Sequence, residues 1–333
     1  KKAFLVGLVV TTAHGIIGIV FANLGFGVWA LVSQHISGCI IGTIVLRQFV
    51  SWRPKLMFSW KSFKEMFSFG SRLLISSLVN TLYNNIYGLV VGKVYSPADL
   101  GEFSKASTFA NFPSYNISGI IQGVSFPVLS TIQDDKEKLK GYYRRIIRVT
   151  AFAVFPAMVG MAAVADPLIR LALTDKWAGM IIYMQILSIA YMWAPIYAIN
   201  LNLLKVLGRS DYFLKLMVVK KAIGFTILII TTPLGLVAMC LGNLFNSWTA
   251  QYVNTYYTKG LIGHGMMDQM KDIRGSLLLS LSMGVIVYLT TSLISSNLIS
   301  LIAGITIGAI YYIGMAVLLK FPELKEIMNL KSA

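Results

Sequence analysis

Long apolar stretches separated by short polar connections recur along the whole chain. A helix that crosses a bilayer needs about 20 predominantly apolar residues, and this spacing predicts about ten membrane-spanning helices. The predicted spans cover residues 4–24, 27–47, 68–92, 104–131, 146–166, 180–206, 213–233, 235–257, 276–295 and 297–319. The expected fold class is therefore all-α, a polytopic membrane helix bundle.

Three of these spans carry polar residues where lipid-facing side chains would be apolar. The polar positions are Asn80, Tyr83, Asn84 and Tyr87 in 68–92, Asn111, Tyr115 and Gln122 in 104–131, and Asn243 and Asn246 in 235–257. Steps of three and four residues place each set largely on one helix face. An unpaired polar group in hydrocarbon costs several kcal/mol, so each face must contact either another helix or water. Interhelical hydrogen bonding is one interpretation; two consecutive stripes, in 68–92 and 104–131, favour a hydrophilic cavity.

Composition supports a membrane protein and gives its orientation. Hydrophobic residues make up 56% of the chain, charged residues 13%, and the mean hydropathy is +0.71. Lys and Arg number 29 against 13 Asp and Glu, and most of them fall in one alternating set of connections. The positive-inside rule places that set, and both ends of the chain, in the cytoplasm. The basic charge then orients the protein and meets anionic headgroups, so no nucleic-acid partner is expected.

The segment 51–66 differs from the spans. Aromatic residues alternate in it with Lys and Arg, in a stretch too short and too charged to cross a bilayer. This pattern is typical of a helix that lies in the membrane interface, and it predicts an interfacial linker between two membrane bundles.

Three basic residues, Arg72, Lys220 and Lys221, fall inside predicted spans. Charges at membrane depth are functional candidates by default. Their long side chains can also reach the headgroups from near a helix end. The alternative is a basic patch lining a cavity, which suits a phosphate-bearing substrate because Arg offers a bidentate fork and Lys a compact charge.

The sequence contains little that supports an enzymatic function. The three histidines are far apart in sequence, and the two cysteines, Cys39 and Cys240, lie in apolar spans without metal-ligand spacing. No Asp or Glu lies in the middle of a predicted span, so these ten spans carry no carboxylate relay for protons or sodium. We expect no enzyme activity, no metal site and no cofactor.

Several longer motifs resemble one known family. They are Asn84-Asn85 followed by the run from Gly92 to Ala106 (GKVYSPADLGEFSKA), Leu24 to Val32 (LGFGVWALV), Trp52-Arg53-Pro54, and Asp175 to Ala178 (DKWA). Together they are similar to the Wzx-type polysaccharide transporters, the O-antigen, capsule and exopolysaccharide flippases of the MOP superfamily. The likeness covers essentially the whole chain, although no single motif is specific.

This resemblance implies a two-lobed transporter of which the chain is mainly the C-terminal lobe. The first span corresponds to the family's fifth helix, so about four N-terminal helices are expected upstream. The implied organisation is residues 1–50 as a remnant of the N-terminal lobe, 51–66 as the linker, 67–258 as a six-helix lobe and 276–319 as an additional helix hairpin.

The implied function is movement of an undecaprenyl-diphosphate-linked oligosaccharide across the bacterial cytoplasmic membrane by alternating access. Arg72, Lys220 and Lys221 are then the candidates for the diphosphate, and the polar stripes for the glycan. Implied partners are the lipid-linked oligosaccharide and membrane lipids, with a polysaccharide polymerase and glycosyltransferases as candidates. Two alternatives stay open: a cation-coupled multidrug exporter of the same superfamily, and an inactive membrane fragment.

Overall fold

The computed structural model describes residues 2–49, 58–60, 63, 64, 67, 71, 74, 78, 81, 82 and 85–329, and every regular element in these ranges is a helix. The all-α class expected from the hydropathy pattern is confirmed. Contacts divide the chain into two compact units, residues 1–75 and 76–333.

The first unit contains a helical hairpin. Helix α1 (Lys2–Asn23) and helix α2 (Val28–Phe49) are joined by a short turn in which Gly25 and Gly27 have φ of +83° and +52°. Side chains with a Cβ rarely adopt this left-handed region, so the turn depends on glycine. Across the hairpin, Gln34 Nε2 lies 3.2 Å from His14 Nδ1, and a Cβ on Gly18 would lie 3.0 Å from Gln34.

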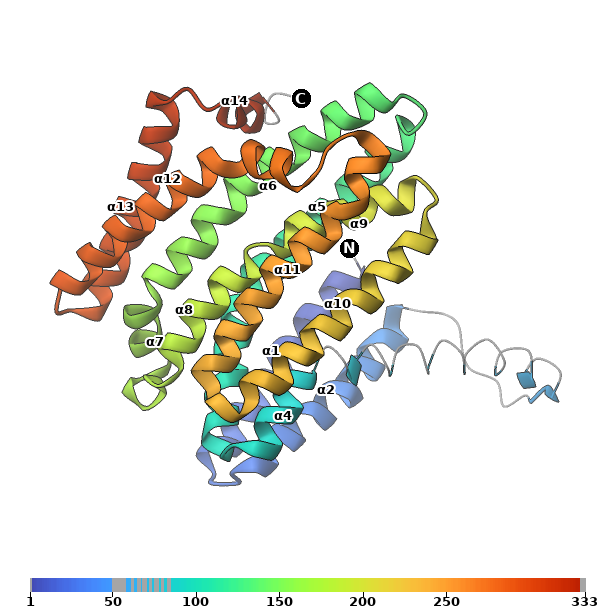
Figure 1. Cartoon of the computed structure of the whole chain (residues 1–333). Helices are drawn as coiled ribbons and strands as arrows, with labels where there is room; N and C mark the ends of the chain where they lie inside the picture. Colours follow the sequence, from blue (N-terminus) through green and yellow to red (C-terminus); the bar gives the residue numbers. More distant parts are fainter. Residues whose placement is uncertain are drawn as a thin grey trace. The chain divides into compact units, whose positions relative to one another are not determined.

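The second unit is a helical bundle (Figure 1). Its elements are α4 (Ile86–Val94), α5 (Pro97–Thr131), α6 (Lys136–Ala163), α7 (Ala165–Leu173), η1 (Asp175–Trp177), α8 (Met180–Tyr191), α9 (Ala194–Val206), α10 (Ser210–Thr231), η2 (Thr232–Leu234), α11 (Leu236–Ile262), α12 (Met266–Leu293), α13 (Asn297–Leu318) and α14 (Pro322–Asn329). Helix α5 starts with a capping box, in which Asp99 N donates to Ser96 Oγ and Ser96 N to Asp99 Oδ2, and Pro97 occupies the first turn.

Helix α6 is at the centre of this unit. It packs against α12 on one side and against α5, α8 and α9 on others, and α13 lies beside α12 (Figure 1). Tyr143, Ile147, Phe155 and Met158 of α6 are fully buried. This helix therefore connects the hairpin of α12 and α13 to the rest of the bundle.

Helix boundaries differ from the predicted spans for physical reasons. Helix α6 begins at Lys136 rather than at 146, and α12 at Met266 rather than at 276, because Lys, Arg and Glu are good helix formers outside the membrane. The span 180–206 is divided into α8 and α9 at Met192 and Trp193, next to Pro195, which lacks the N–H that a continuous helix needs there.

Seven of the described helical stretches are long and apolar enough to cross a membrane. They are Val6–Asn23, Val28–Gln48, Lys136–Ala163, Met180–Val206, Lys215–Leu234, Met266–Leu293 and Asn297–Leu318. The protein is therefore a multi-pass membrane protein. Helices α5 and α11 are long enough but more polar, and most of 68–87 lies outside the described residues, so these three spans stay predictions.

We expect Gly284→Ala to destabilise the contact between α12 and α6. A Cβ at Gly284 would overlap with Val159 Cγ1, and overpacking of this kind costs about 1–3 kcal/mol. Gly314→Ala on α13 is the matched control, because no atom lies within 4 Å of a Cβ there. Thermal unfolding of the purified protein in detergent measures the difference; equal midpoints for the two variants would contradict this packing.

Candidate functional site

The polar stripe of α5 is divided between two faces of the helix. Asn111, Tyr115 and Gln122 are exposed on the surface of the second unit, and Tyr115 retains 72% of its accessible surface. They follow one another at steps of four and seven residues, so they form one row along the helix. We call these three residues the α5 polar row.

Other polar side chains of α5 point inward and make interhelical hydrogen bonds. Ser114 Oγ donates to the carbonyl oxygen of Tyr191 (2.7 Å), and Ser107 Oγ lies 3.0 Å from Tyr191 Oη. Ser125 Oγ accepts from Asn202 Nδ2 at 2.9 Å. These bonds attach α5 to α8 and α9. The role of the α5 polar row in lining a hydrophilic cavity stays a prediction.

On α11 the polar face turns into the bundle. Asn243 and Asn246 are half-buried, and the same face continues to Ser247, Gln251 and Asn254, which are buried. Their role in lining a cavity stays a prediction. The opposite face of α11 exposes aromatic side chains: Phe245, Trp248, Tyr252 and Tyr256.

The described candidate cations lie on α10. Lys220 and Lys221 are both half-buried, and Lys220 forms no ion pair within the part of the chain that the structure describes. Tyr87, at the start of α4, is also half-buried. Arg72, Asn80, Tyr83 and Asn84 lie outside the described residues, as does most of the linker 51–66. Within that linker, the rings of Trp60 and Phe63 stack with centroids 5.4 Å apart.

A buried hydrogen-bond network links helices that the sequence patterns did not connect. Tyr143 Oη of α6 donates to Asn200 Oδ1 of α9 at 2.6 Å, and Gln269 Nε2 of α12 lies 3.1 Å from both oxygens. Gln251 of α11 donates to Gln269 Oε1. All four side chains are at most 1% exposed. The isolated amides in otherwise apolar helices were the only available signal, and they do not reveal which partners they meet.

Next to this network, His264 lies in the connection between α11 and α12. Its Nε2 is 3.3 Å from Asp272 Oδ2, and Arg144 holds both oxygens of Asp272 at 2.6 and 2.9 Å. Burial lowers the pKa of His264 below its usual 6.5, more than the Asp272 carboxylate raises it.

When folding lowers the pKa of a histidine, the unfolded chain takes up a proton at a higher pH than the folded protein does. A fall in pH therefore favours unfolding. We therefore expect the free energy of unfolding to be unaffected by His264 protonation above pH 6.5. It should decrease as the pH falls through 6.5 towards the lowered pKa of the folded state. Thermal midpoints across this interval check the sign. His264→Gln should flatten the pH dependence there, and an unchanged pH dependence in this variant would contradict the assignment.

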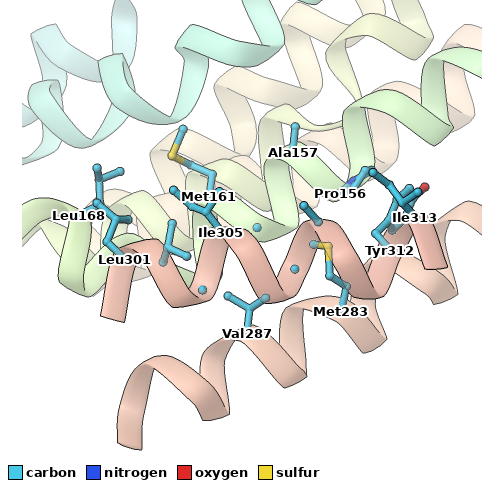
Figure 2. A pocket seen from close by; sticks show the side chains of 15 residues that line it. Pro156, Ala157, Met161, Leu168, Met283, Val287, Leu301, Ile305, Tyr312 and Ile313 are labelled. Atoms are coloured by element: carbon cyan, nitrogen blue, oxygen red, sulfur yellow. The ribbon is translucent and has the colours of Figure 1, made fainter. Parts of the chain in front are cut away.

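An apolar groove of about 510 Å³ runs between α6 and α13. Figure 2 shows Met161, Leu168, Leu301 and Ile305 at one end and Pro156, Tyr312 and Ile313 at the other, with Met283 and Val287 of α12 on its floor. Gly304 and Gly308 let α13 approach α12 closely, since a Cβ on either would lie within 3.0 Å of an α12 side chain. The groove has the chemistry of a site for a hydrocarbon chain.

Comparison with known proteins fits this arrangement of helices. The profile of the polysaccharide biosynthesis protein family matches residues 1–182. The chain belongs to this family. The family likeness expected from the sequence motifs is thereby confirmed.

The names of several curated relatives of this family member refer to polysaccharide biosynthesis. The chain is 27% identical over 234 residues to the lipopolysaccharide biosynthesis protein WzxC of Escherichia coli (strain K12), covering 68% of this chain and 47% of WzxC. Over 160 residues it is 26% identical to the teichuronic acid biosynthesis protein TuaB of Bacillus subtilis (strain 168), covering 48% and 33%. The succinoglycan biosynthesis transport protein ExoT of Rhizobium meliloti (strain 1021) is 23% identical over 178 residues, covering 54% and 36%. The chain thus spans half or less of the length of these relatives.

The fold of this family member matches a solved membrane transporter. The lipid II flippase MurJ in its inward closed conformation superposes with a TM-score of 0.64 at 18% identity, over 92% of this chain and 66% of MurJ. At this identity the match establishes the fold alone, a MurJ-like bundle of membrane helices.

Proposed function

We propose that the protein moves a lipid-linked oligosaccharide, carried on undecaprenyl diphosphate, across the bacterial cytoplasmic membrane by alternating access. The observation that carries this proposal is the α5 polar row, which presents amide and phenol groups on the surface of a membrane bundle. Such groups are costly against hydrocarbon, so they suit a hydrated passage for sugars. Family membership and the transport and flippase names of ExoT and MurJ point the same way.

Three parts of the substrate would meet three kinds of surface. The sugar hydroxyls would exchange water for the amides and phenol of the α5 polar row, with Tyr87, Asn243 and Asn246 as further contacts. Lys220, Lys221 and Arg72 would hold the diphosphate through charge-assisted hydrogen bonds. The apolar groove between α6 and α13 would accept the isoprenoid chain, which thereby stays in a hydrocarbon environment. No covalent chemistry and no cofactor enter this cycle.

Transport is tested with the protein as it is naturally made, reconstituted in phospholipid vesicles. A fluorescent undecaprenyl-diphosphate oligosaccharide in the inner leaflet should become accessible to an external, sugar-binding lectin faster than in protein-free vesicles. A fluorescent cationic drug in parallel vesicles tests the exporter alternative. Movement of the drug without movement of the glycolipid would overturn the proposal, as would protein-free rates for both.

Filling the apolar groove should slow transport. Ala157 of α6 and Ala309 of α13 both line it. Ala157→Phe with Ala309→Phe should reduce the rate about tenfold. The two rings would take the space of the isoprenoid chain, and a loss of roughly 1.4 kcal/mol of binding free energy corresponds to a factor of ten. The control is Ile302→Phe with Ile310→Phe, which enlarges exposed positions of α13 that are not among the groove-lining residues. Equal rates for both double variants would exclude the groove from transport.

A further inference from the structure

The end of the bundle that carries most of the basic residues contains a second, chemically different pocket. It has a volume of about 330 Å³ and lies where α6, α12 and α14 meet. Arg148 of α6 and Lys271 and Arg274 of α12 provide its charge, and Leu319, Phe321 and Pro322 form an apolar wall. We call it the basic pocket.

The cations of this pocket are only partly neutralised. Asp272 also lines it, but Arg144 binds both of its carboxylate oxygens. Glu323, which also lines the pocket, forms an ion pair with Arg148 at 3.7 Å. Lys271 and Arg274 are exposed and form no ion pair among the residues that the structure describes. Positive charge therefore remains available for an anion.

The surroundings of the pocket combine this charge with hydrocarbon. Phe321 of its wall packs on Phe152 with ring centroids 5.9 Å apart, and Phe152 packs on Tyr312 at 5.1 Å. The last turns of α13, which lead to the pocket, expose Ile313 and Val317. A ligand that reaches this pocket from the bilayer would thus place an anionic group on the cations and apolar chains against α13.

The pocket is separate from the α5 polar row. Helix α6 packs against both α5 and α12, and so lies between the row on one side and the hairpin of α12 and α13 on the other. In Figure 1 the α12–α13 hairpin, in orange and red, borders α6 at the edge of this unit. An occupant of the basic pocket would contact the hairpin and α14 instead of the surface assigned to the sugars.

We propose that the basic pocket binds the phosphate of an anionic membrane phospholipid, such as phosphatidylglycerol, as a bound lipid that is not transported. Arg148 and Arg274 supply planar forks for phosphate oxygens and Lys271 a compact charge. Basic pockets between helices at the membrane surface recognise anionic headgroups in this way. The apolar wall and the exposed end of α13 favour a lipid over a soluble anion.

Native mass spectrometry of the purified protein with equimolar phosphatidylglycerol and phosphatidylcholine tests this site. The unchanged protein should retain phosphatidylglycerol preferentially, and Arg148→Gln with Lys271→Gln and Arg274→Gln should lower its retention about tenfold. The matched control, Lys136→Gln with Lys138→Gln and Lys215→Gln, removes the same charge from exposed positions outside the pocket and should leave retention unchanged.

Three results would overturn the proposal. An equal loss in the two triple variants would mean diffuse attraction to the basic surface, and equal retention of both lipids would mean no headgroup recognition. Displacement of phosphatidylglycerol by millimolar inorganic phosphate would assign the pocket to a soluble anion. If the triple variant fails to fold, as judged by gel filtration, Arg274→Gln alone is decisive, because this side chain is exposed and forms no ion pair with any residue in the described ranges. It should lower retention about threefold, and no change would reject the site.

Discussion

Replacing the α5 polar row with leucine is expected to abolish transport while the protein still folds. In the variant Asn111→Leu, Tyr115→Leu and Gln122→Leu, sugar hydroxyls passing α5 would lose their hydrogen-bond partners. Each buried polar group left unsatisfied costs about 1–3 kcal/mol, so three together raise the barrier enough for a loss of at least roughly a hundredfold. The vesicle assay with the fluorescent glycolipid measures the rate.

The control for this variant uses the same helix. Phe112, Ile120 and Val124 are also exposed on α5 but apolar, at 69, 66 and 57%. Phe112→Leu with Ile120→Leu and Val124→Leu should leave the rate within about twofold, because apolar contacts are exchanged for apolar contacts. Near-normal transport by the polar-row variant, at equal amounts of folded protein, would remove the main support for a sugar pathway along α5.

Removing the charges of Lys220 and Lys221 is expected to weaken substrate binding strongly. Hydrogen bonds to charged groups contribute about 1.5–3 kcal/mol each, so Lys220→Gln with Lys221→Gln should lower affinity for the diphosphate-linked lipid by at least roughly tenfold. The reduction should be smaller for an analogue with one phosphate, because fewer charged oxygens remain to be bound.

Lys215 and Lys259 provide the comparison for this experiment. Both are exposed, at the first turns of α10 and the end of α11, so Lys215→Gln with Lys259→Gln removes the same charge from the surface. Exposed charges act mainly through long-range, salt-screened attraction. If both double variants lost affinity equally, and the loss vanished at high salt, the two lysines of α10 would have no specific role at the diphosphate.

The buried hydrogen-bond network indicates which helices move together during transport. Tyr143, Asn200, Gln251 and Gln269 join α6, α9, α11 and α12 by hydrogen bonds, and Arg144 attaches α6 to Asp272 of α12. Removing one partner of a buried hydrogen bond in this network leaves the other partner unpaired. The bundle around α6 and the start of the hairpin is therefore expected to move as one body during alternating access.

Much of the fold follows from the hydropathy pattern because a bilayer leaves few choices. Every backbone group must be paired within the spanning segment, so a run of about 20 apolar residues specifies a helix whatever its neighbours are. The same reasoning located the polar row, since Asn111, Tyr115 and Gln122 at helical spacing must share a face. Helix ends were less accurate at Lys136 and Met266, because hydropathy reports membrane depth and not where a helix begins.

The sequence by itself thus determined the class, the membrane-spanning character and the family of this protein, all of which depend on local pattern and motif. Only the tertiary structure separated Ser107, Ser114 and Ser125, which bond to α8 and α9, from the exposed polar row on the same helix. It also brought Gln269 to Asn200, and Arg148 to Lys271 and Arg274. The reason is physical: periodicity fixes which residues share a helix face, whereas the partner of that face depends on how helices distant in the chain pack together.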